Sequence, residues 1–188
     1  MLDPLVEVHD PSTPPPPKET DDALFARELP PRAAEIFASI LGLDLTPAPG
    51  EPLIANDGHR RWSGCIAMSG DWRGAVTLSC LEPMARTITA AMFGTEPDTS
   101  TDAEIQDAIG EMANMFGGQV KSVLGDRSVL GLPVVIEGDN FETTVPHSHA
   151  VVKLHFHCES HPVDVVIVGA DARTVGARRD GSHAVSEN

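Results

Sequence analysis

Residues 102–124 read DAEIQDAIGEMANMFGGQVKSVL and form the longest helical pattern that we identify in the sequence. Apolar side chains recur in it every three or four residues, which is the spacing of one face of an α-helix. The apolar stripe consists of Ile105, Ile109, Met112, Phe116, Val120 and Val123. Thr101 and Glu104 form a capping-box pattern at its start. We therefore expect a helix from about Asp102 to Leu124 with one face buried in the core.

Shorter elements are expected on both sides of this helix. Proline at a helix start and glycine just past its end mark two further helices, and runs of β-branched and apolar residues mark five strands. In chain order we expect a helix that begins at Pro31 and ends at Gly42, strands at 62–69 and 74–80, a helix between Pro83 and Gly94, the helix at 102–124, and strands at 131–137, 149–158 and 162–169.

The order of these elements predicts the fold class. It lacks the strict strand–helix alternation of a doubly wound parallel sheet. In 149–158, apolar residues alternate with polar ones, as in an antiparallel sheet with one face in water. The apolar set is Val152, Leu154, Phe156 and Cys158, and the polar set is Lys153, His155, His157 and Glu159. We expect an α+β fold, a largely antiparallel sheet with helices packed on one face.

Proline content suggests where the folded domain begins. The chain has 188 residues, which fits one domain with tails, and ten of its 16 prolines fall within residues 1–50. We expect residues 1–30 to be an acidic, Pro-rich and largely disordered tail, with a short helix over 20–28 as an exception. The domain then covers 31–172, and 173–188 form a C-terminal tail.

Charge and composition exclude several functions. With 28 acidic and 13 basic residues the formal charge is -15, which disfavours nucleic acid and anionic membranes as partners. No apolar run is long enough to span a bilayer, and the start lacks the basic and apolar regions of a secretory signal. Three cysteines without a CxxC pair fit a reducing compartment. We expect a cytoplasmic protein.

The opposite face of the 102–124 helix carries the candidate site. Asp107, Glu111, Asn114, Gly118 and Lys121 follow at i, i+4, i+7, i+11 and i+14, which places them on one ridge. Each mid-helix glycine costs about 1 kcal/mol relative to alanine. A position without a side chain beside an amide and a carboxylate suggests that another molecule comes close there, although packing against another helix is also possible.

Together these residues resemble the CheC/CheX/FliY phosphatases of bacterial chemotaxis. The resemblance rests on Asp107-x-x-x-Glu111-x-x-Asn114, on Gly118-x-x-Lys121, on Pro133 in GLPVVIEG, and on the preceding segment GAVTLSCLEPMARTITAAMFG. It covers roughly residues 31–170. CheC-like members carry two such helices and CheX-like members one. Here Glu35 is followed by Ala38 where a second motif needs asparagine, so the chain is most like CheX.

The resemblance implies a reaction and a role for each residue. Family members hydrolyse the aspartyl phosphate of CheY, a response regulator that carries its own Mg²⁺. By resemblance, Asn114 orients the attacking water and Glu111 binds the regulator's active-site lysine. Asp107, Gly118 and Lys121 are the candidate partner contacts, although ordinary solvated charges explain Asp107 and Lys121 at least as well. A homodimer is implied, and no metal or cofactor of the protein's own.

Two alternatives stay open at this stage. The same fold could bind a response regulator or a flagellar-switch component without catalysis, as an adaptor. In the strand at 149–158, His155 and His157 point to one face, and Glu159 or His161 could complete a metal site. We favour a solvated strand or a dimer surface there, because the spacing fixes no third ligand. Esterase, NTPase and dinucleotide-binding motifs do not occur.

Overall fold

The computed structural model describes residues 20–48, 60–139, 141, 145 and 147–170. Residues 1–19 of the expected N-terminal tail and the whole expected C-terminal tail, 173–188, lie outside the described residues. The helical elements are α1 (Asp21–Ile36), η1 (Phe37–Leu41), α2 (Glu82–Phe93), η2 (Pro97–Thr99), α3 (Asp102–Leu124) and η3 (Gly125–Arg127). The strands are β1 (Leu45–Pro47), β2 (Arg61–Gly70), β3 (Gly74–Leu81), β4 (Ser128–Gly138), β5 (Ser148–Cys158) and β6 (His161–Ala170).

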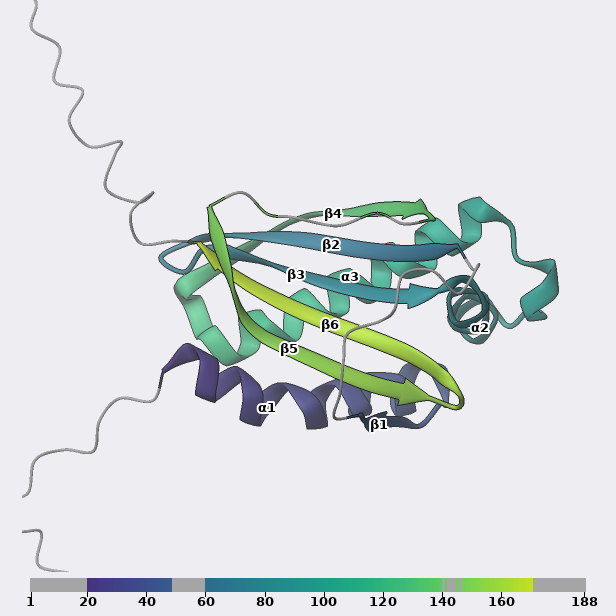
Figure 1. Ribbon diagram of the computed structural model, residues 1–188, viewed down its shortest axis with the longest axis horizontal. Coiled ribbons are helices and arrows are strands. Elements are labelled where there is room, and N and C mark those ends of the chain that lie inside the picture. The colour runs from purple at the N-terminus through teal and green to yellow at the C-terminus, as the bar shows by residue number, and fades with distance from the viewer. Residues whose placement is uncertain (1–19, 49–59, 140, 142–144, 146, 171–188) are drawn as a thin grey trace, which may run out of the picture.

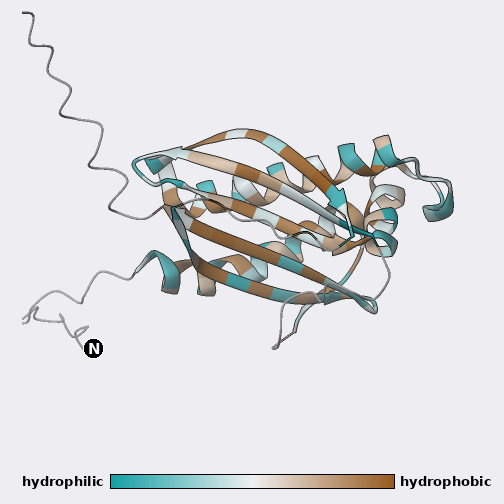
Figure 2. Ribbon diagram, turned by 45° about the horizontal axis from the view of Figure 1, so that its top comes forward, coloured by the Kyte–Doolittle hydropathy of each residue, from teal (hydrophilic) through white to brown (hydrophobic). Residues whose placement is uncertain are grey.

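The six strands form one sheet in the order β1-β5-β6-β3-β2-β4, and every neighbouring pair is antiparallel. Helices α1 and α3 pack against one face of this sheet, and α2 lies at one end of it (Figure 1). Hydrophobic residues recur along the strands of the sheet (Figure 2). The expected α+β architecture with helices on one face is confirmed.

Helix α1 corrects the expected start of the domain. The sequence predicts a tail up to residue 30, with a short helix over 20–28, and a separate helix from Pro31. In the structure a single helix, α1, begins at Asp21 and continues through Pro30 and Pro31. Its buried residues are Phe25, Leu29, Ala33 and Ile36. These form one face at helical spacing, and their burial offsets the backbone hydrogen bonds that the two prolines remove.

Helix α3 lies very close to strand β2 because residue 64 of that strand is a glycine. A Cβ on Gly64 of β2 would lie 2.6 Å from the carbonyl oxygen of Ile109 and 2.9 Å from Cβ of Ala113. Ile109 and Ala113 are both almost fully buried. No side chain larger than hydrogen fits at residue 64 at this separation, so the glycine fixes how deeply α3 sits on β2.

Strand β5 departs from the expected alternation in two places. His155 is largely buried, and its Nδ1 lies 2.7 Å from Oδ1 of Asp164 on β6, so it does not lie on a fully solvated face. Glu159 lies in the turn after the strand with a positive φ of 55°. Cys158 is buried with the apolar set, as expected. The three-residue strand β1, which pairs with the end of β5, was not expected from the sequence, because three residues are too few to show a strand period.

Candidate functional site

The five ridge residues of α3 lie on its outer face. Asp107, Glu111, Asn114 and Lys121 are exposed, and Gly118 is half-buried. The ridge spans about 20 Å along the helix axis, at about 1.5 Å per residue. Glu111 and Asn114 are three residues apart and so project from neighbouring positions one turn apart. Both side chains can therefore enter the same pocket of another molecule.

Hydrogen bonds at its first turn fix the start of α3. The backbone N–H of Glu104 donates to Oγ1 of Thr101 at 3.3 Å, and the backbone N–H of Thr101 donates to Oε2 of Glu104 at 2.8 Å. These bonds to the Thr101 backbone and hydroxyl hold the pKa of the Glu104 carboxyl below its usual value. The expected capping box is present, and it fixes the residue at which α3 begins.

Arg60 ties the start of α3 to two other elements near the site. Its Nη2 lies 2.9 Å from Oδ1 of Asp102 and 2.8 Å from Oε2 of Glu137 at the end of β4. Its Nε lies 3.6 Å from Oε2 of Glu82 at the start of α2. The guanidinium also stacks over the ring of Trp62, 4.9 Å from its centroid. One side chain thus forms ion pairs with carboxylates of α2, α3 and β4.

The two adjacent glycines of α3 have different surroundings. A Cβ on Gly117 would lie 2.7 Å from Cγ2 of Ile66 and 3.1 Å from Cδ2 of Leu130, so this glycine is needed for packing on the sheet. A Cβ on Gly118 would meet no atom within 4 Å. The structure therefore separates the alternatives for Gly118 within the described residues: no packing neighbour requires it to be glycine.

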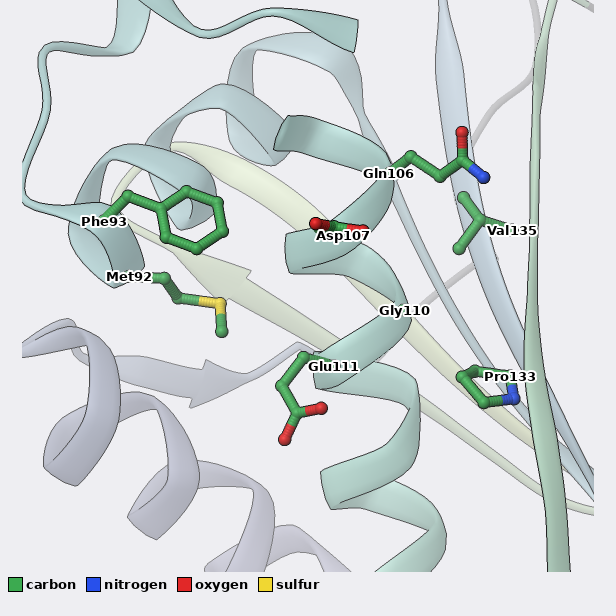
Figure 3. Close-up of a pocket in the computed structure, with 8 residues that line it drawn as sticks. All are labelled: Met92, Phe93, Gln106, Asp107, Gly110, Glu111, Pro133 and Val135. Carbon is green, nitrogen blue, oxygen red and sulfur yellow. The ribbon is translucent and has the colours of Figure 1, made fainter. Parts of the chain in front are cut away.

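A groove of about 450 Å³ opens beside the ridge. Helix α3 forms its floor, the end of α2 one wall and β4 the other (Figure 3). Asp107 and Glu111 of the ridge lie on the floor. Asn114 follows Glu111 by three residues, about one turn further along α3. The lining residues are Met92, Phe93, Gln106, Asp107, Gly110, Glu111, Pro133 and Val135.

Three of the lining residues, Pro133, Met92 and Phe93, differ in how far the sequence predicted their place in this groove. Pro133, which is 19 residues beyond Asn114 in the chain, comes to the same groove as Asp107 and Glu111. From the sequence, Met92 and Phe93 were predicted only to belong to a helix, and not to line a site. Phe93 is 48% exposed, and the left-handed Gly94 directly after it ends α2 at this point. The sequence signal that could have indicated this exposed position is a large apolar residue directly before the glycine that ends the helix.

The histidine-bearing strand stays apart from this groove. The imidazole of His155 is bound to Asp164, and His157 is exposed. In the described part of the chain, no three His, Cys, Asp or Glu side chains come together in a group that could hold a metal ion. Burial raises the pKa of the Cys80 thiol to about 12 and that of Cys158 to about 11, so neither is a ready nucleophile.

No helix among the described residues is both long enough and apolar enough to cross a membrane.

The fold is that of solved chemotaxis proteins. CheX from Vibrio vulnificus superposes with a TM-score of 0.65 at 23% identity, over 79% of this chain and 98% of that chain. CheX from Desulfovibrio desulfuricans gives 0.60 at 21% identity, over 79% and 98%. A CheX–CheY–BeF₃–Mg²⁺ complex from Borrelia burgdorferi gives 0.60 at 16% identity, over 78% and 98%. No curated protein matches the chain in sequence.

The described fold is similar to the folds of solved CheX, CheC-like and FliY proteins. The sequence profile described as "Chemotaxis phosphatase CheX" matches residues 62–157, which is just over half of the chain. The chain therefore belongs to the CheX family of chemotaxis phosphatases.

Proposed function

We propose that this protein removes the phosphoryl group from the aspartate of a CheY-like receiver domain. The observation that carries the proposal is the placement of Glu111 and Asn114, exposed and one turn apart, on a helix whose position is fixed by its capping box and by Gly64. Membership of the CheX family supports a phosphatase. The neighbour from Borrelia burgdorferi, which holds CheY with BeF₃ and Mg²⁺, supports a receiver as the substrate.

Asn114 would act on the attacking water. Its carboxamide oxygen can accept a hydrogen bond from the water while its NH₂ donates to a phosphoryl oxygen. The water oxygen forms a bond to phosphorus as the bond to the aspartate oxygen breaks, and the products are the free carboxylate and inorganic phosphate, which keeps the protons of the water. Because phosphoryl transfer passes through a loose transition state, fixing the water in line supplies much of the acceleration.

Glu111 would hold the two proteins in register. Its carboxylate can form a charge-assisted hydrogen bond with the lysine that a receiver carries in its active site. That contact places Asn114, one turn further along α3, over the phosphoryl group. Mg²⁺ belongs to the receiver in this scheme, so the protein supplies no metal of its own.

The remaining ridge residues would form the outer contacts of the complex. Gly118 leaves space for the receiver's backbone, since nothing in the described structure occupies the position of its Cβ. Lys121, near the end of α3, would contact the rim of the acidic active site of the receiver. Action on a receiver domain also places the protein in the cytoplasm.

A homodimer is the second element of the proposal. Strand β4 is one of the two outer strands of the described sheet, and its Val129, Leu132 and Val134 are 60%, 86% and 58% exposed. An edge strand with exposed apolar side chains readily pairs with another chain. We place the contact between two copies at this edge.

The proposal is tested by the loss of phosphate from a receiver. A CheY-like receiver from the same genome is phosphorylated with a small-molecule donor in Mg²⁺, the donor is removed, and phosphate release is followed with and without the protein. Faster release supports a phosphatase. Binding to the phosphorylated receiver without faster release would make the protein an adaptor instead.

A further inference from the structure

The walls of the α2–β4 groove are apolar and come from two elements. Met92 and Phe93 at the end of α2 face Pro133 and Val135 of β4 across the floor formed by α3 (Figure 3). Phe93 is 48% exposed. Large apolar side chains left at the surface in a concave site are typical of a contact with another molecule.

The carboxylates on the floor differ from the other acids at this end of the molecule. Asp102 and Glu137 each form an ion pair with Arg60. Among the described residues, no ion pair is found for Asp107 or Glu111. The groove thus offers two carboxylates without a cation, between apolar walls.

The occupant that fits this combination is a lysine or arginine side chain. Its aliphatic stem can pack on one of the apolar walls while its charged head reaches a carboxylate. The ring of Phe93 adds an attractive surface for a cation. An acidic partner group is disfavoured by the two carboxylates and by the net charge of -15.

Helix geometry places this basic side chain relative to the receiver's active site. Asp107 and Glu111 are four residues apart, so their Cβ atoms are about 5–6 Å apart on the same face. If Glu111 binds the active-site lysine, Asp107 meets a different basic residue, one turn away and on the rim of the receiver's active site.

We propose that the α2–β4 groove receives this second basic side chain of the receiver, and that Asp107 and Phe93 thereby determine which receivers are bound. The inference rests on the proposed function, since it takes a receiver as the partner. In this proposal the groove determines the affinity for the receiver, and Asn114 acts in hydrolysis.

The test measures binding and turnover separately with the full chain. The probe is a CheY-like receiver from the same genome, held in its active form with BeF₃⁻ and Mg²⁺ for binding and phosphorylated for turnover. We expect Asp107→Asn and Phe93→Ala each to raise Kd about tenfold, as for central interface residues, with kcat unchanged at saturating receiver. Asp107→Asn also flattens the dependence of Kd on salt, whereas Phe93→Ala does not.

Asp22→Asn is the matched control. Asp22 is an exposed acid in the first turn of α1, and neighbouring Asp21 is ion-paired with Arg127 beyond the far end of α3. The control should leave Kd and its salt dependence unchanged. A scan that changes each basic residue on the rim of the receiver to glutamine should find one whose effect disappears in Asp107→Asn.

The experiment distinguishes a failure of the groove proposal from a failure of the proposed phosphatase function. Wild-type affinity in both groove variants, or a fall in kcat with unchanged KM, overturns the groove proposal while receiver dephosphorylation by the wild type stands. A wild type that binds the receiver without dephosphorylating it overturns the phosphatase, and the Kd values still decide the role of the groove. A wild type that binds no receiver overturns both.

Discussion

A Cβ on Gly117 would lie only 2.7 Å from Cγ2 of Ile66, so the middle of α3 rests directly on β2. Its neighbour Gly118 has open space at the same position. The two adjacent glycines therefore serve different purposes: the first allows α3 to pack on the sheet, and the second leaves the ridge bare between Asn114 and Lys121.

This difference predicts opposite effects of the same substitution. Gly117→Ala gains about 1 kcal/mol of helix propensity, but overpacking against Ile66 costs about 1–3 kcal/mol. Gly118→Ala keeps the gain without the clash. In urea unfolding, Gly118→Ala should be at least as stable as the wild type and Gly117→Ala clearly less stable than Gly118→Ala. Gly118→Ala should also weaken receiver binding. Equal stabilities of the two variants would contradict the packing.

The capping box predicts a dependence of stability on pH. Bonding to Thr101 lowers the pKa of Glu104 below its unfolded value, so the charged carboxylate favours the folded state. That contribution is present above the unfolded pKa and is lost as the pH falls through the folded pKa. Relative to Glu104→Gln, the wild type should therefore be more stable at neutral pH, and the difference should disappear in acid. Denaturant unfolding at several pH values measures this, with exposed Glu35→Gln as the control. A difference that persists in strong acid would argue against it.

The buried pair of β5 and β6 predicts a structural role for one histidine. His155→Ala removes the contact of the imidazole with the Asp164 carboxylate at 2.7 Å, and a hydrogen bond to a charged group contributes about 1.5–3 kcal/mol. His157→Ala, on the exposed part of the same strand, should cost little. Urea unfolding of the two variants, with and without EDTA, measures both effects. A stability that falls on chelation in the wild type would instead favour a metal at this strand.

The exposed edge of β4 predicts the oligomeric state. Val134→Lys places a charge in the apolar edge that we propose joins two copies. The wild type should sediment as a dimer and the variant as a monomer with an unchanged circular dichroism spectrum. A wild type that is monomeric at all accessible concentrations would exclude the contact.

Local signals predicted most of the elements of the fold. Gly94 and the Thr101–Glu104 pair stand where α2 ends and α3 begins, because caps act within one turn. The sequence predicted a short helix over 20–28 and another from Pro31, but not that the two are one helix of the domain. Prolines 30 and 31 are local evidence against a continuous helix, and the burial of Phe25 and Leu29 in the assembled core outweighs them.

The candidate site was predicted only along a single element. Helical periodicity placed Asp107, Glu111 and Asn114 on one exposed face. It could not show that Phe93 and Pro133 flank the same face, because the contact of α2 and β4 with α3 is a property of the tertiary structure. The roles of Glu111 and Asn114 in hydrolysis stay predictions.

The most direct test is the effect of Asn114→Ala on binding and hydrolysis of the same phosphorylated receiver. If Asn114 orients the water, the variant should keep the wild-type Kd for the BeF₃⁻-activated receiver and lose at least about 100-fold in the rate of phosphate release. Glu111→Gln should weaken binding, and Glu35→Gln on α1 should change neither quantity. An Asn114→Ala variant that dephosphorylates the receiver at the wild-type rate would contradict the proposed mechanism.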